Sequence, residues 1–270
     1  MEHARVCLIA EAVPYFCAGP QYNYAYLAPA SRSMMRPAQS CWGVTMTPTM
    51  NTNISKTQTA RSTHLVICAN PSPASFDTAI VDAYSAEVRD RGHKAVVRNL
   101  YALGFDPVLK EDERPGQSQW APRADVAEEL DHVRDADVIV LVYPIWYGMP
   151  PAILKGYIDR VLGANYSFRA VHDQRGQTGL AGKPLLSFST SGLPLDWLSE
   201  RGQVLSLREI LDVYLWRGFG MKQSEHVMIE SVVPNMSTAY ATTQLDRVRH
   251  TAARTCAMLE NTLLVEVYES

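Results

Sequence analysis

The sequence lacks the cysteine and histidine patterns of disulfide-bonded and metal-binding proteins. Its cysteines are odd in number and widely scattered, with no C-x-x-C pair: Cys7, Cys17, Cys41, Cys68 and Cys256. The histidines show neither H-x-x-x-H nor H-E-x-x-H spacing. We therefore expect no disulfide framework and no metal site, and a reducing compartment, the cytoplasm, fits this cysteine usage.

Long apolar runs and concentrated positive charge are missing as well. No stretch of about 18 apolar residues occurs, so no membrane span is expected. Glu11 interrupts the apolar segment near the N-terminus, and no basic residues lead into a signal sequence. The formal net charge is -3 and the chain has no run of Lys or Arg. Nucleic-acid binding needs a concentrated basic face, so no such partner is expected.

Residues 1 to 62 differ from the rest of the chain. They are rich in Ala, Pro, Ser, Thr, Met and Asn and show no sustained periodicity. This composition is typical of a disordered leader, or of a translation start assigned too far upstream. A transit peptide is the weaker alternative, because the segment is poor in Arg and contains Glu2 and Glu11. We expect residues 1 to 62 to be a disordered extension and residues 63 to 266 to form the folded domain.

From residue 64 onward, short apolar runs alternate with helical patterns. The runs predict strands at residues 64–69, 94–97, 137–143, 185–189 and 227–230. The helical patterns predict helices at residues 76–90, 128–133, 150–162, 205–215 and 238–264. Strands that alternate with helices indicate an α/β fold with a parallel sheet covered on both faces. Five such strands favour the flavodoxin-like three-layer sandwich, with strand order 2-1-3-4-5.

Ligands of such sheets bind beyond the carboxyl ends of the strands, near the switch in strand order. The loop after the first strand, residues 70 to 77, is short and polar and opens a helix, whose N-terminus attracts phosphate. It lacks the G-x-G-x-x-G and G-K-[ST] patterns, so a phosphate site here would be of the flavin mononucleotide kind. The alternative is a simple helix cap, with Ser75 or Asp77 as the capping residue.

Two further loops fall on the same edge of the predicted sheet. The loop after the third strand presents Trp146 and Tyr147, whose aromatic faces would suit a flat redox ring, or would fill a core or dimer contact. The loop after the fourth strand, residues 189 to 192, has small residues whose amides could reach a ring edge, or it is an ordinary polar turn. The acidic run of residues 111 to 113 is expected to be a solvated loop.

Residues 143 to 162, YPIWYGMPPAILKGYIDRVL, resemble a segment of the flavodoxin-like NAD(P)H dehydrogenase (quinone) family. The family pattern is F-P-[LIM]-x-W-[FY]-x-x-P-A-[IL]-L-K-G-[WY]-x-[DE]-R-V. Ser75 and Phe76, residues 99–102 and 105–107, and the segment LSFSTSG at residues 186–192 add to the likeness. The resemblance extends over roughly residues 64 to 265.

The resemblance implies a tightly bound flavin, FMN or FAD, that takes a hydride from NAD(P)H and passes two electrons to a quinone or similar small electrophile. It also implies a homodimer, with Trp197 and Trp216 as candidate contributors to the interface. The residues implied to hold the flavin phosphate region are Asn70, Ala74, Ser75, Phe76 and Asp77. Those implied to hold the ring are Pro144, Ile145, Trp146, Tyr147, Gly148, Ser189, Thr190, Ser191 and Gly192.

Departures from the family pattern leave the acid–base chemistry unassigned. Asn70 stands where the family usually has His, and Gly148 takes the slot of the second aromatic residue. The tyrosine and histidine that assist hydride transfer in mammalian members fall near Trp197 and Gln203, and neither identity is kept.

Two alternative functions remain open from the sequence. One is a flavin- or nucleotide-binding regulatory subunit of a membrane transporter, and the other is an FMN-dependent tailoring enzyme in biosynthesis.

Overall fold

The computed structural model describes residues 61–114, 120–165 and 179–269, with side chains described as far as residue 261. All described residues belong to one compact unit, which lies within residues 55–270. The predicted disordered extension over residues 1 to 62 lies almost wholly outside the described residues, so it stays a prediction.

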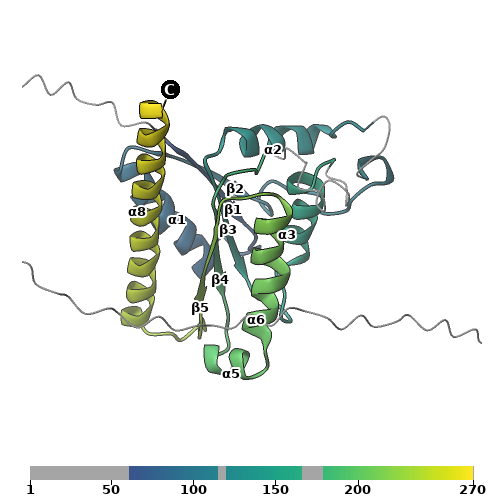
Figure 1. The fold of residues 1–270 in the computed structure, drawn as a ribbon. Coiled ribbons are helices and arrows are strands. Elements are labelled where there is room, and N and C mark those ends of the chain that lie inside the picture. The colour runs from purple at the N-terminus through teal and green to yellow at the C-terminus, as the bar shows by residue number, and fades with distance from the viewer. Residues whose placement is uncertain (1–60, 115–119, 166–178, 270) are drawn as a thin grey trace, which may run out of the picture. The chain divides into compact units, whose positions relative to one another are not determined.

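Five parallel strands form one sheet in the order β2-β1-β3-β4-β5, as Figure 1 shows edge-on. The strands are β1 (Thr63–Cys68), β2 (Lys94–Asn99), β3 (Val138–Pro144), β4 (Leu185–Thr190) and β5 (Ser224–Ile229). Every residue of the central strand β3 is buried, which explains its uninterrupted apolar sequence. The predicted flavodoxin-like strand order is confirmed.

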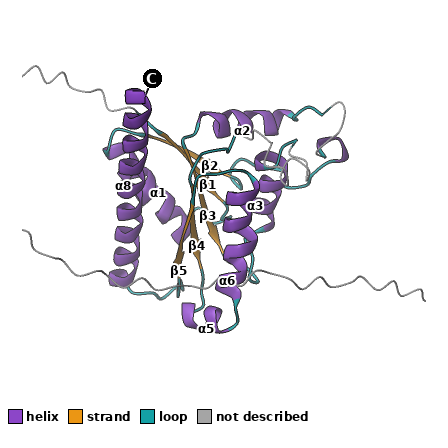
Figure 2. Ribbon diagram, viewed as in Figure 1, coloured by secondary structure: helices purple, strands orange, loops and turns teal. Residues whose placement is uncertain are grey.

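Helices cover both faces of this sheet (Figures 1 and 2). On one face lie α1 (Phe76–Asp90) and α8 (Thr238–Glu269), which pack against each other and share one apolar core with the strands. The other face carries α2 (Ala124–Asp135), α3 (Ala152–Tyr157), η2 (Ile158–Leu162), α6 (Gln203–Leu207), η3 (Arg208–Val213) and α7 (Tyr214–Gly218). The sheet therefore separates two apolar cores, as a doubly wound fold requires.

Local sequence signals set several element ends. The side chain of Ser75 caps α1, since its Oγ accepts a hydrogen bond of 3.2 Å from the amide of Thr78. Gly92 follows the cap of the same helix with φ 84°, the left-handed conformation that glycine adopts at little cost. Two short helices were not predicted, η1 (Glu111–Glu113) and α5 (Leu195–Glu200). Residues 203 to 218 form a longer helical run than predicted, and its middle, η3, has π-helical hydrogen bonding.

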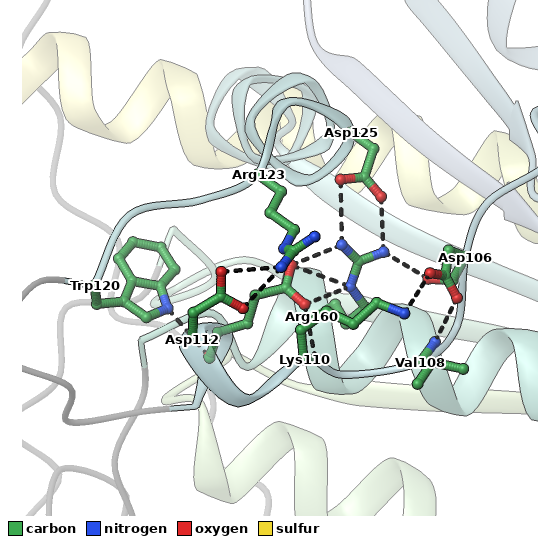
Figure 3. A network of polar contacts seen from close by, with 9 residues as sticks. Asp106, Val108, Lys110, Asp112, Trp120, Arg123, Asp125 and Arg160 are labelled. Atoms are coloured by element: carbon green, nitrogen blue, oxygen red, sulfur yellow. Dashed lines mark hydrogen bonds and ion pairs between the residues drawn. The ribbon is translucent and has the colours of Figure 1, made fainter.

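The prediction of a solvated acidic loop is wrong for Glu113. This side chain is buried and accepts hydrogen bonds of 3.0 Å and 2.6 Å from Nε and Nη2 of Arg160. Asp125 and the carbonyl oxygen of Asp106 accept further hydrogen bonds from the same guanidinium (Figure 3). Burial alone would raise the pKa of Glu113, but the hydrogen bonds from Arg160 lower it below its ordinary value. The segment around Glu113 is polar, but the ion pair with Arg160, 47 positions later in the sequence, holds this side chain inside the protein.

None of the described helices is long and apolar enough to cross a membrane.

Candidate functional site

The loop after β1, which we call loop one (residues 70–77), is folded by its own side chains. The amide of Ser72 donates a hydrogen bond of 2.9 Å to Oδ1 of Asn70, which tightens the chain into a turn. Nδ2 of Asn70 donates in turn to Oδ2 of Asp77, at 2.6 Å. Loop one leads directly into the capped N-terminus of α1, where first-turn amides have no partners within the helix.

Asp77 joins loop one to the loop after β4. Its side chain is buried, and Oγ1 of Thr190 donates to it at 3.1 Å. Burial raises the pKa of Asp77, while the hydrogen bonds from Asn70 and Thr190 act in the opposite direction. The carboxyl group of Asp77 therefore faces inward and links the end of β1 to the end of β4, while residues 71–74 of loop one are exposed.

The loop after β3, loop two (residues 145–149), forms a tight turn with an aromatic tip. The amide of Trp146 donates to the carbonyl of Met149, and the amide of Met149 donates to the carbonyl of Trp146, at 2.9 Å and 3.0 Å. Tyr147 and Gly148 both have positive φ, 50° and 82°. A type I′ turn requires this geometry, which is strained for tyrosine. The turn leaves the Tyr147 ring fully exposed and the Trp146 ring 41% exposed.

The start of α6 lies against loop two. A Cβ atom at Gly148 would lie 2.1 Å from Nε2 of Gln203, so any other residue there would displace the flexible end of this side chain. Gln203 was noted in the sequence only as a place where a family histidine is missing. The structure puts it in contact with the predicted ring-binding loop.

The last two residues of β4 and the two residues that follow, which we call loop three (residues 189–192), complete the edge. The amide of Ile145 donates to the carbonyl of Thr190 at 2.8 Å, so loops two and three are directly bonded. Oγ of Ser191 accepts from the amide of Leu193 at 3.0 Å, which turns the chain away from the sheet. Gly192 is exposed, and a Cβ there would meet only the carbonyl oxygen of Val232, in the segment after β5, 3.8 Å away. The structure thus brings all three predicted loops together.

A chain of polar side chains that the sequence did not reveal runs beneath loops two and three. Nε2 of His226 lies 2.7 Å from Oγ of Ser189, and Nδ1 of His226 lies 2.6 Å from Oδ2 of Asp212. Oγ of Ser187 donates to the other oxygen of Asp212, at 2.7 Å. These residues come from β4, β5 and η3, and all four are buried or nearly so.

Tyr143 lies beside this chain. It is the register partner of Ser189 on β3, and its ring centre lies 6.2 Å from that of His226. Its hydroxyl is buried and has no hydrogen-bond partner among the described residues. Burial, and then the negative charge of Asp212, raise the pKa of Tyr143 well above its ordinary value. The phenol therefore stays neutral.

The structure defines an open, doubly wound α/β protein whose loops meet beyond the carboxyl edge of a parallel sheet, where such proteins bind ligands. The flavodoxin-like fold family model matches residues 62–251, and the chain belongs to this family.

Named relatives agree with the resemblance described above. An NAD(P)H oxidoreductase of Haemophilus influenzae, called uncharacterized, is 34% identical over 164 residues, which cover 60% of this chain and 80% of that protein. The NAD(P)H dehydrogenase (quinone) 1 of Cavia porcellus is 31% identical over 148 residues, 47% of this chain. That match spans only about half of the Cavia protein, 53%. The predicted family is confirmed.

Solved structures have the same fold. The NAD(P)H:quinone oxidoreductase of Methanothermobacter marburgensis superposes with a TM-score of 0.63 at 23% identity and covers 73% of this chain and 96% of its own. An FMN-dependent NADH-azoreductase of Bacillus anthracis, solved with FMN, gives a TM-score of 0.55 at 18% identity and covers 72% and 100%. At these identities the likeness shows the fold alone.

Proposed function

We propose that this chain is a flavin-dependent NAD(P)H oxidoreductase that passes two electrons by hydride transfer to a quinone or similar small electrophile. The observation that carries the proposal is the joining of loops one, two and three at a single edge of the sheet, through the Asp77–Thr190 and Ile145–Thr190 hydrogen bonds. The names of the sequence relatives, NAD(P)H oxidoreductase and NAD(P)H dehydrogenase (quinone), support it.

Loop one suits the phosphate end of a flavin. A capped helix N-terminus offers free amides and a positive dipole end, so it attracts an anion without a lysine. The hydroxyls of Ser72 and Ser75 lie in the same loop. The one carboxylate of the loop, Asp77, is turned toward Asn70 and Thr190 and so does not face an anion at the outer surface.

Loops two and three suit the ring end. The exposed Trp146 side chain offers an apolar face to a planar heterocycle. Gly192 lacks a side chain and has open space around it, so a ring can approach the backbone closely there, whereas the side-chain amide of Gln203 fills the corresponding space at Gly148. Bound flavin would supply the hydride chemistry, and the protein would bind the ring, orient it and shield it from water.

Cofactor release tests the proposal and decides between FMN and FAD. Purified protein, or protein reconstituted with each flavin and freed of excess by filtration, is denatured and the released cofactor is weighed by mass spectrometry. We expect close to one flavin per chain. The FMN complex of the azoreductase fold neighbour supports FMN as the first candidate. Protein that retains neither flavin would contradict the proposal.

Replacement of Trp146 by alanine is expected to weaken flavin binding at least about tenfold, or roughly 1.4 kcal/mol, because the ring loses an aromatic contact. Titration of apoprotein with flavin, followed by quenching of flavin fluorescence, measures the dissociation constant. Trp146→Phe serves as the matched control, because it keeps an aromatic face and should retain most of the affinity. Equal flavin affinities for wild type and Trp146→Ala would contradict the assignment of Trp146 to the ring site.

A homodimer belongs to the same proposal. A groove of about 700 Å³ runs between the helices η2 and η3, and its rim carries the exposed side chains of Ile210 and Tyr214. A contiguous exposed apolar surface of this kind marks an interaction site. Two copies related by twofold symmetry would cover it. Trp216 packs partly against the protein's own core, while Trp197 is exposed and stacks with Arg201.

We expect wild-type protein to sediment as a dimer and Ile210→Asp to sediment as a monomer, since a carboxylate in the groove would be buried without a partner. Sedimentation velocity at micromolar concentration gives the two masses. Leu103→Asp is the control, because Leu103 is also an exposed apolar residue but lies outside the groove lining. A monomeric wild type would contradict the dimer, as would an Ile210→Asp variant that stays dimeric. We also propose a cytoplasmic location, where thiols such as those of Cys68 and Cys256 stay reduced.

A further inference from the structure

The buried chain Ser189–His226–Asp212 has a defined direction. The Asp212 carboxylate can only accept at Oδ2, so His226 must donate its Nδ1 proton there. Nε2 of a neutral His226 is then an acceptor, and the hydroxyl of Ser189 donates to it. The second oxygen of Asp212 is already used by Ser187. Every polar atom of the three residues therefore has an assigned role.

Protonation of His226 would reverse the last link of this chain. With protons on both ring nitrogens, Nε2 becomes a donor and Ser189 must accept from it. The Ser189 hydroxyl proton is then released to point toward another acceptor. Ser189 is the second-last residue of β4 and the first residue of loop three. The charge on the imidazole of His226 thus determines where the Ser189 hydroxyl points, at the edge of the predicted ring site.

His226 has one carboxylate in direct contact with its ring. The described groups that face it are Asp212 from η3, Tyr143 from β3, and Ser187 and Ser189 from β4. Within the described part of the chain, neither Lys nor Arg forms an ion pair with Asp212, and His226 is the basic side chain that contacts it. The His226 side chain keeps 11% of its surface exposed, which leaves it in contact with solvent protons.

We propose that Asp212, His226 and Ser189 form a proton relay beneath the ring site, in which His226 binds a solvent proton when a hydride enters the site from NAD(P)H. The inference rests on the proposed function. A hydride brings two electrons but only one proton, so the site gains one negative charge and the oxidised nicotinamide leaves. The proton bound at Nε2 of His226 balances that charge. When the acceptor takes the hydride away, His226 gives up its proton, so charge and protons are restored. Asp212 is a positioning residue that fixes the imidazole tautomer.

The midpoint potential of the bound flavin as a function of pH tests this relay. Each proton taken up with two electrons changes the equilibrium constant tenfold per pH unit, or about 30 mV for a two-electron couple. We expect the potential of wild-type protein to fall by about 30 mV per pH unit more steeply around neutral pH than that of His226→Gln or Asp212→Asn. His132→Gln, at a half-exposed histidine on α2, is the control and should keep the wild-type slope.

A second measurement needs no substitution. In wild-type protein labelled with ¹⁵N-histidine, the nitrogen resonances of one buried imidazole should change from neutral to charged at neutral pH when the flavin is reduced anaerobically. Equal slopes in wild type and both variants, or no imidazole that changes state on reduction, would overturn the relay while leaving the flavin function intact. A wild type that binds no flavin would overturn the function itself. If the variants do not fold, the ¹⁵N-histidine measurement on wild-type protein decides the question by itself.

Discussion

Arg160→Met is expected to lower the free energy of unfolding by about 3–5 kcal/mol, because it leaves a buried carboxylate without its partner. The Arg160 side chain is 1% exposed and that of Glu113 is 4% exposed. The guanidinium also donates to Asp125 and to the carbonyl of Asp106, so it ties η2 to α2 and to the segment that follows β2 (Figure 3). Urea unfolding followed by circular dichroism measures the loss.

An exposed arginine in the same region provides the matched control. Arg123 donates two hydrogen bonds of 3.0 Å to Asp112, but both side chains are largely exposed to solvent. Arg123→Met should therefore cost less than about 1 kcal/mol. Replacing Glu113 by Gln in the Arg160→Met protein should recover part of the loss, since it removes the uncompensated charge. If Arg160→Met costs no more than Arg123→Met, the buried ion pair is not important for stability.

His64 is expected to make the protein sensitive to acid. It is fully buried on β1, with Nδ1 2.9 Å from Oη of Tyr84 and Nε2 3.3 Å from Oγ of Ser62. Burial, and then the nearby His93, lower the pKa of His64 from 6.5 to about 3. The unfolded chain therefore binds a proton at His64 at a higher pH than the folded protein does.

The sign of the effect follows from this difference. Stability from the neutral imidazole is fully present above pH 6.5 and is lost as the pH falls from about 6.5 toward about 3. The slope is at most about 1.4 kcal/mol per pH unit, and the whole change amounts to roughly 4–5 kcal/mol. Urea unfolding at a series of pH values measures it. His64→Gln lacks the titrating group and should show a flatter dependence; identical slopes in the two proteins would contradict the role of His64.

The sequence predicted the sheet and the meeting of the three loops at one edge well, because both depend on local patterns. Apolar runs such as residues 137–143 identify buried strands, and the residues after each run must lie at one edge of a parallel sheet. The N-cap Ser75 and the turn at Gly92 are likewise local signals. The meeting of the three loops follows from the topology alone. The hydrogen bond between Asp77 and Thr190 does not, because these residues are 113 positions apart in the sequence.

What the sequence did not reveal depends on contacts between distant elements. Asp212 and His226 lie in different elements, and only folding places both next to Ser189. One signal was present: Ser187 and Ser189 alternate on one face of a fully buried strand, and such buried hydroxyls need polar partners. Glu113 was misjudged for a similar reason, since its partner Arg160 follows 47 positions later.

Anaerobic titration of the flavin-loaded protein with NADH or NADPH tests the central claim most directly. The account predicts that the visible flavin absorbance bleaches with one equivalent of reduced nicotinamide and returns when a quinone is added. Flavin that stays bound and oxidised after this addition would contradict the oxidoreductase function and favour a regulatory flavin-binding role. Protein that cannot be loaded with FMN or FAD would contradict the flavin site itself.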